Sequence, residues 1–134
     1  MATEKNTVIL YIDDDPDDVE MLQEAIRSIN SGYQLRKAAD GIEGLQLLQK
    51  MKGNGTLPCL IVLDLNMPGM DGRQTFIKIK QDDVLRSIPV VIFSTSSSSL
   101  DQLFFRDKNV EYITKPIQYL RLLEIAKKLL SMCN

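Results

Sequence analysis

Acidic, hydroxyl and amine side chains follow four short apolar segments of this sequence. Residues 60–63 lead into Asp64, and residues 8–12 lead into Asp13 and Asp14. The other two segments end in residues of different chemistry: Ser94 and Thr95 after residues 90–93, and Thr114 and Lys115 after residues 112–113. Apolar runs bounded by polar turns are typical of buried strands. Asp64, which such a strand delivers into a turn, is therefore the candidate nucleophile.

The chemistry that these side chains could perform together is phosphoryl transfer to a carboxylate. Carboxylates gathered at one place repel one another, and a hard divalent cation with oxygen ligands offsets that repulsion. We therefore expect Mg²⁺ to bind beside Asp13, Asp14 and Asp64. The cation would screen the charge of Asp64, Lys115 would bind phosphoryl oxygens, and Ser94 would donate to another oxygen. These roles describe an aspartate that accepts a phosphoryl group covalently.

Strand-like and helix-like apolar periods alternate along the chain, which predicts βα units on a parallel sheet. Five strands, each followed by a helix, imply an α/β fold with an open, doubly wound sheet. Ligand sites of such sheets lie outside the carboxyl ends of the strands. Right-handed crossovers keep parallel strands pointing the same way. We therefore expect the strand-end residues to converge at one edge, namely Asp13, Asp14, Asp64, Ser94 and Lys115.

Apolar residues at helical spacing predict the buried face of each helix. In the helix after Asp40 the predicted inner residues are Ile42, Leu45, Leu48 and Met51. In the helix before the fifth strand they are Leu100, Leu103 and Phe104. The adjacent Phe105 is then a surface ring, either an anchor for a partner or an ordinary exposed residue. The last helix begins at about Ile117, and its predicted inner residues are Leu122, Leu123, Ala126, Leu129 and Leu130.

Length and charge limit the classes of partner. At 134 residues the chain is most simply one domain. Its net charge of -2, from 16 basic and 18 acidic residues, provides no basic stripe of the kind that neutralises nucleic-acid phosphates. No apolar stretch approaches the roughly 18 residues that a membrane span needs. We expect a cytoplasmic chain that binds neither nucleic acid nor membrane.

The chain contains no histidine, which removes the serine-histidine hydrolases, most zinc enzymes and a phosphohistidine intermediate within this chain. The remaining chemistry must use carboxylates, hydroxyls, lysine and metal. The two cysteines, Cys59 and Cys133, are a poor framework for a stapled secreted domain or a zinc site. We expect both to be free thiols.

Taken in order, four motifs resemble the receiver domain of bacterial two-component response regulators, and the resemblance covers essentially the whole chain. The motifs are Asp13-Asp14, Asp64 with the turn at residues 67–72, Ser94-Thr95 and Lys115-Pro116. The resemblance implies a flavodoxin-like sheet in the order 2-1-3-4-5, with residues 1–134 forming one receiver domain without an output domain. The opening of the chain is most similar to stand-alone receivers, of the chemotaxis-regulator type or those that work with phytochrome-type kinases.

The resemblance also assigns roles to single residues. It implies that Asp64 is the phosphoacceptor, that Asp14, Asp64 and the Asn66 backbone carbonyl ligate Mg²⁺, and that Asp13 holds metal-bound water. It implies a phosphohistidine donor on a separate sensor histidine kinase or histidine phosphotransfer protein, followed by slow loss of the phosphate to water.

Two further positions, Ser94 and Tyr112, align with the switch residues of the family. The hydroxyl would move toward the phosphoryl group and the ring would follow, which changes the face formed by the fourth helix, fifth strand and fifth helix. That face would then contact a separate effector, and a homodimer through it stays open. The alternative for Tyr112 is an ordinary packed ring.

Three other functions fit the sequence less well. A haloacid-type phosphohydrolase also uses an aspartate after a strand, but it needs a second acid two residues on, where this chain has Asn66. Flavin binding on the same sheet would want a phosphate-cradling loop of Gly, Ser and Thr, whereas residues 13–18 are mostly acidic. The remaining alternative is a receiver-fold protein-binding module that works without phosphorylation. The complete acid set and Lys115 argue against it.

Overall fold

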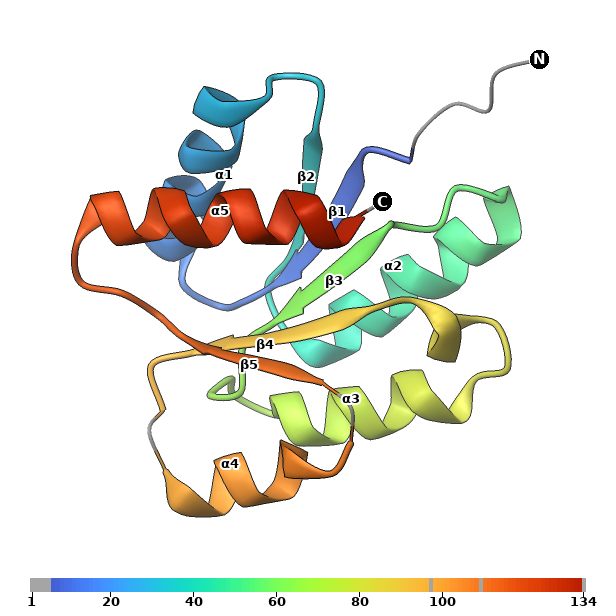
Figure 1. Ribbon diagram of the computed structural model, residues 1–134. Helices are drawn as coiled ribbons and strands as arrows, with labels where there is room; N and C mark the ends of the chain where they lie inside the picture. The colour runs from blue at the N-terminus through green and yellow to red at the C-terminus, as the bar shows by residue number, and fades with distance from the viewer. Residues whose placement is uncertain (1–5, 97, 109, 134) are drawn as a thin grey trace.

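The computed structural model describes residues 6–96, 98–108 and 110–133, which form a five-stranded parallel sheet with helices on both faces (Figure 1). The strand order β2-β1-β3-β4-β5 confirms the predicted topology. The strands are β1 (Val8–Ile12), β2 (Gln34–Ala38), β3 (Leu60–Leu63), β4 (Val90–Ser94) and β5 (Glu111–Thr114).

The predicted helices are all present within these residues. They are α1 (Pro16–Ile29), α2 (Gly41–Asn54), α3 (Gly72–Gln81), α4 (Ser99–Arg106) and α5 (Tyr119–Cys133). A short 3-10 helix, η1 (Leu85–Ser87), precedes β4 and was not predicted. No helix among the described residues has both the length and the apolar character needed to cross a membrane.

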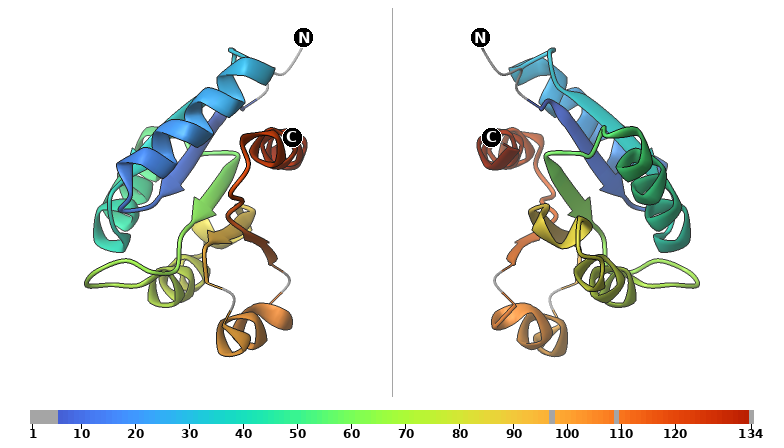
Figure 2. Two further views of the ribbon diagram at one scale, coloured as in Figure 1. Left: turned by 90° about the vertical axis from the view of Figure 1, so that its left-hand side faces the viewer. Right: turned by 90° about the vertical axis from the view of Figure 1, so that its right-hand side faces the viewer.

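Alternate side chains of the central strands fill two cores, one on each face of the sheet. Ile9 and Tyr11 of β1 pack with α1 and α5, whereas Leu10 and Ile12 pack with α2, α3 and α4. The two groups of helices can be followed around the sheet in Figure 2. Strands β3 and β4 are buried on both faces, which is why each reads as a continuous apolar run in the sequence.

Aspartate N-caps fix the start of the three helices that follow the first three strands. The Asp15 carboxylate accepts hydrogen bonds from two backbone N–H groups of the first turn of α1, with Pro16 at the first helical position. The Asp40 carboxylate accepts a hydrogen bond from the Glu43 N–H in the first turn of α2, and Asp71 forms a capping box with Gln74 at the start of α3. Such caps satisfy N–H groups that would otherwise lack a partner. They also fix where the loops after β1 and β3 end.

The buried face of α2 differs from the prediction at Ile42, which is 52% exposed. Leu48 and Met51 are buried as predicted, but the inner face continues through Gly41 and Gly44. A Cβ on Gly44 would lie 2.5 Å from the Ile12 side chain, so the helix backbone itself approaches β1. Glycine permits this close packing because it has no side chain, and the helix rotates so that Ile42 points outward.

The buried face of α4 also differs from the prediction. Phe105 is buried and Phe104 is only partly buried, whereas Leu100 and Leu103 are exposed. The Phe105 ring packs edge-on against Phe76 of α3, with ring centroids 5.2 Å apart. The expectation that Phe105 is a surface ring was therefore wrong. Spacing alone could not distinguish two adjacent aromatic residues.

Helix α5 lies beside α1 and buries most of the predicted residues. Leu122, Ala126 and Leu129 are buried, together with Ile125, which was not predicted. The helix begins at Tyr119 rather than near Ile117. Its apolar stripe therefore belongs to the core that α1 and α5 form on one face of the sheet.

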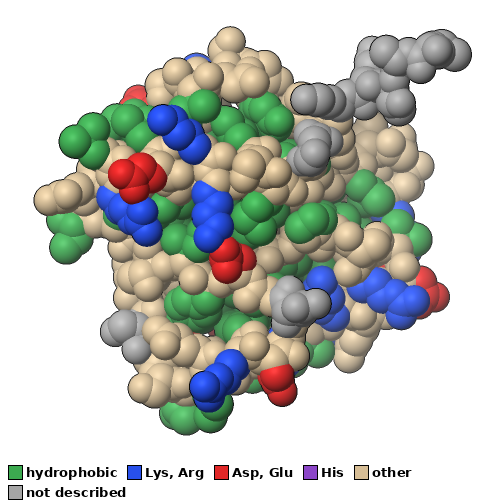
Figure 3. Space-filling model, viewed as in Figure 1, with side chains coloured by type: hydrophobic (Ala, Val, Ile, Leu, Met, Phe, Trp, Pro, Cys, Tyr) green, Lys and Arg blue, Asp and Glu red, His purple; other side chains and the backbone are tan. Residues whose placement is uncertain are grey.

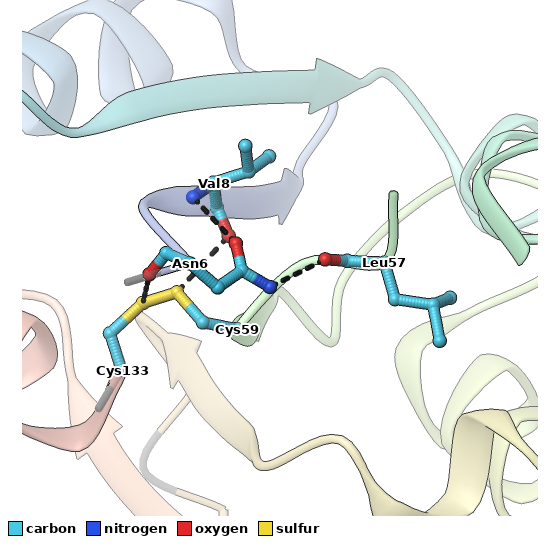
Figure 4. Close-up of a disulfide and its surroundings, with 5 residues drawn as sticks. All are labelled: Asn6, Val8, Leu57, Cys59 and Cys133. Atoms are coloured by element: carbon cyan, nitrogen blue, oxygen red, sulfur yellow. Dashed lines mark hydrogen bonds between the residues drawn. A yellow bond between two sulfur atoms is a disulfide. The ribbon is translucent and has the colours of Figure 1, made fainter. Parts of the chain in front are cut away.

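Cys59 and Cys133 form a disulfide, so the expectation of two free thiols was wrong. Cys59 directly precedes β3, Cys133 ends α5, and their Cα atoms lie 4.9 Å apart. The two residues are 74 positions apart in the sequence, which hid this proximity. Figure 4 shows the pair beside Asn6, whose side chain donates to the Leu57 carbonyl at 2.7 Å and accepts from the Val8 N–H at 3.1 Å. The disulfide therefore ties the end of α5 to the start of β3, where the Cys59 N–H donates to the Val8 carbonyl of β1.

Replacing Cys133 with serine is expected to lower the free energy of unfolding of the oxidised protein by about 2–4 kcal/mol, because a crosslink between distant positions restricts the unfolded chain. Denaturant titration measures this difference. Wild type in the presence of a reductant should fall to the value of the variant, and the variant should not respond to reductant. Equal stability of oxidised and reduced wild type would contradict the prediction.

Candidate functional site

Backbone hydrogen bonding of the sheet continues one residue past the strands and fixes the site residues in place. The Asp64 N–H donates to the Ile12 carbonyl at 3.0 Å, and the Lys115 N–H donates to the Ser94 carbonyl at 2.9 Å. The Asp13 N–H likewise donates to the carbonyl at the end of β2. The carboxyl ends of three strands therefore place Asp13, Asp64 and Lys115 at one edge, as predicted from the topology.

Three carboxylates gather at this edge. Asp13, Asp14 and Asp64 each offer an oxygen atom, and these oxygens lie within 4.8 Å of one another. Asp13 and Asp64 are buried, whereas Asp14 is exposed. Oxygen donors with net negative charge and one side open to water suit a hard divalent cation. These three residues are the ones that would hold it.

Lys115 brings a single positive charge into contact with this cluster. Its Nζ atom lies 2.6 Å from an Asp13 oxygen, 2.8 Å from an Asp18 oxygen and 3.6 Å from an Asp64 oxygen. The Lys115 side chain is only 9% exposed. The prediction that Lys115 converges with Asp13 and Asp64 is thus met by direct ion pairs.

Burial and these ion pairs shift the titration of both central groups. Burial raises the pKa of the Asp64 carboxyl to about 6, against the attraction of the Lys115 ammonium and with the repulsion of the Asp13 charge. Burial would lower the pKa of Lys115, but its hydrogen bonds to Asp13 and Asp18 and the charge of Asp64 raise it above its ordinary value. At neutral pH Asp64 is therefore ionised and Lys115 is protonated.

Two residues of the site were missed by the sequence reasoning. The buried Tyr11 hydroxyl donates to Asp13 at 2.7 Å, and Asp18 of α1 pairs with Lys115. Burial, and then the neighbouring Asp13 charge, raise the pKa of Tyr11. A signal for Tyr11 existed, because residues two apart on a strand share a face and Tyr11 precedes Asp13 by two. Asp18 lay within an acidic run that resembled an ordinary first turn of a helix.

The turn after Asp64 is held close to the strand end by Gly72. A Cβ on this glycine would lie 2.3 Å from the Asp64 carbonyl oxygen and 2.7 Å from the Leu65 Cα. The Gly72 N–H donates to the Leu65 carbonyl at 3.0 Å, which closes the turn. Asn66 lies exposed in this turn, directly beyond the buried Leu65.

The two predicted switch residues meet at a third one. Ser94 is fully buried, and its hydroxyl accepts a hydrogen bond from the Ser96 N–H at 3.1 Å. The Tyr112 hydroxyl donates to the Ser96 carbonyl at 2.8 Å. The Ser96 hydroxyl in turn donates to Asp101 of α4, and Asp101 pairs with Arg73 of α3. Ser94, Tyr112 and α4 are therefore connected through Ser96.

The sequence profile of the response regulator receiver domain matches residues 9–127, which extend from β1 into α5. Among curated proteins, the response regulator Rcp1 of Synechocystis sp. is 35% identical over 120 residues, which cover 86% of this chain and 82% of that protein. The residues 9–127 that match the family include Asp13, Asp14, Asp64, Ser94 and Lys115.

Solved structures give the same relationship. The phosphorylated cyanobacterial phytochrome response regulator RcpA superposes with a TM-score of 0.83 at 34% identity, covering 92% of this chain and 90% of that chain. The Mn²⁺-bound form of Rcp1 superposes with a TM-score of 0.81 at 32% identity. The superposition covers 93% of this chain and 92% of that chain.

Binding of Mg²⁺ or Mn²⁺ is expected to weaken by up to about tenfold per pH unit below the Asp64 pKa, because a proton competes for the same oxygens. That pKa is about 6, so the dependence should fade above it, where Asp64 is already ionised. Calorimetric titration with the ion across this range measures the effect. Asp64→Asn, which cannot titrate, should bind the ion more weakly and lose this part of the pH dependence. A constant wild-type affinity across the range would contradict the prediction.

Proposed function

Because this chain belongs to the response regulator receiver domain family, we propose that it accepts a phosphoryl group on Asp64 and signals through the change of shape that follows. Receiver domains are signalling domains of two-component systems rather than classical enzymes, and they interact with histidine kinases and effectors. The observation that carries the proposal is the buried Asp64 carboxylate, placed against two further acids and the Lys115 ammonium.

The phosphoryl donor is a phosphohistidine on a separate sensor kinase or phosphotransfer protein. This chain has no histidine of its own to serve as the donor. An Asp64 oxygen forms the new bond to phosphorus while the phosphorus–nitrogen bond of the donor breaks, so the group moves without oxidation or reduction. The similarity to the cyanobacterial phytochrome response regulator RcpA supports a phytochrome-type kinase as the class of donor.

The remaining site residues stabilise the charge of the transferred group. A Mg²⁺ ion held by Asp13, Asp14 and Asp64, with the Asn66 backbone carbonyl as a further ligand, would screen the negative charge of the acceptor and the phosphoryl group. The Lys115 ammonium would bind a phosphoryl oxygen, a role that its 3.6 Å distance from Asp64 supports. The Ser94 hydroxyl would donate to another oxygen when it leaves the Ser96 N–H.

The output is a change in the α4–β5–α5 face. This face already carries exposed apolar side chains, and Figure 3 shows such side chains over α4 and the start of α5. The exposed residues are Leu100, Leu103, Ile117, Tyr119 and Leu120. A groove of about 690 Å³ between α4 and β5 is lined in part by Leu103 and Tyr112, so movement of the tyrosine ring would reshape it. The partner on this face is a separate effector or a second copy of the chain.

Asp64→Asn is expected to abolish the phosphoryl adduct, because an amide oxygen is too weak a nucleophile to attack phosphorus. Intact-mass spectrometry after incubation with Mg²⁺ and acetyl phosphate or phosphoramidate measures the adduct. Asp83→Asn, which removes the charge of a solvent-exposed carboxylate, is the matched control and should be labelled like wild type. An adduct on Asp64→Asn would place the phosphoacceptor elsewhere. A folded, metal-binding wild type that forms no adduct would favour a module that works without phosphorylation.

Tyr112→Ala is expected to leave the adduct intact and to remove the phosphorylation-dependent change in α4 and β5, since the ring and its bond to Ser96 are lost. Hydrogen–deuterium exchange over residues 99–106 and 111–114, with and without the phosphoryl group, measures this change. Tyr119→Ala is the control, because it removes a tyrosine from the same face without touching the Ser96 loop. A full change in Tyr112→Ala would rule out the switch role.

A further inference from the structure

The Lys115 ammonium is shared unequally among its carboxylate neighbours. Asp13 and Asp18 lie within hydrogen-bond distance of Nζ, at 2.6 and 2.8 Å, while Asp64 is farther away at 3.6 Å. An ammonium has three hydrogens to donate. Two of them are used on Asp13 and Asp18, so the group is held mainly away from the residue that would carry the phosphoryl group.

Asp18 reaches Lys115 because of the way α1 begins. Asp15 caps the helix and Pro16 occupies its first position, which places Asp18 one turn into α1. The Asp18 side chain is 32% exposed, whereas that of Lys115 is 9% exposed. Water therefore competes little for the ammonium, and the carboxylates around it decide where it lies. Asp18 is the member of this set that does not belong to the acid cluster at the strand ends.

We propose that Asp18 is a positioning residue that holds the Lys115 ammonium toward α1. The ammonium therefore binds a phosphoryl group at Asp64 more weakly than it would without Asp18. This inference rests on the proposed function. A phosphoryl oxygen must draw the ammonium toward Asp64 against the attraction of Asp18, which opposes formation of the adduct. The carboxylate on α1 then sets how strongly the site binds the transferred group.

Removing the Asp18 charge should strengthen binding of a phosphoryl analogue. Asp18→Asn is expected to bind beryllofluoride, in the presence of Mg²⁺, about three- to fivefold more tightly than wild type, in line with the size of a partly exposed ion pair. Titration followed by amide NMR signals measures the affinity. Mg²⁺ alone should bind within about twofold of wild type, because Asp18 acts on Lys115 and not on the ion.

Asp17→Asn is the matched control, because it removes the same charge from the same helix turn and Asp17 is not one of the Lys115 ion-pair partners found among the described residues. Asp18→Ala is a second variant in case the asparagine still accepts a hydrogen bond from Lys115.

Tighter beryllofluoride binding by both Asp18 variants than by Asp17→Asn supports the inference. Equal binding by the Asp17 and Asp18 variants, or an equal change in Mg²⁺ affinity, overturns it. A wild type that binds Mg²⁺ but not beryllofluoride would instead defeat the proposed function, so the two failures are distinguishable.

Discussion

The Lys115 ammonium lies between 2.6 and 3.6 Å from carboxylates that belong to three different parts of the chain. Asp13 follows β1, Asp18 lies in α1 and Asp64 follows β3, so one positive charge joins the ends of the central strands to the first helix. Charges removed from water are tolerated only when they are paired. The sheet bonds hold the acids together, and the Lys115 ammonium neutralises only part of their negative charge. The remaining negative charge accounts for the fit to a divalent cation, while burial, assisted by the Asp13 charge, raises the pKa of Asp64.

The convergence of Asp13, Asp14, Asp64 and Lys115 could be predicted from sequence because it depends only on topology. Parallel strands end at one edge, so residues that follow the strands must meet there. Tyr11 and Asp18 could not be found in the same way. Their roles depend on which side chain reaches which atom across the core and across a helix turn, and strand or helix periodicity does not encode those distances.

The buried faces of α2 and α4 were predicted less well, because packing partners rather than hydrophobicity decide how each helix is rotated about its axis. Ile42 turns outward because Gly44 lets the α2 backbone approach β1. Phe105 turns inward because Phe76 offers its ring an edge-on partner and because Asp101 of the same helix is paired with Arg73. The disulfide depends on α5 returning to the amino-terminal edge of the sheet, a distance that no local pattern contains.

Transmission of a conformational change from the acid cluster to α4 depends on Ser96. All polar groups of Ser96 form hydrogen bonds. Its N–H donates to Ser94, its carbonyl accepts from Tyr112 and its hydroxyl donates to Asp101. Movement of the Ser94 hydroxyl toward a phosphoryl group must therefore break or displace the first bond. Each such bond contributes roughly 1 kcal/mol, so losing the set together costs a few kcal/mol, which is the scale that separates two populated conformations. Because Asp101 is also tied to Arg73, the loop and the start of α4 are expected to change as one unit rather than by degrees.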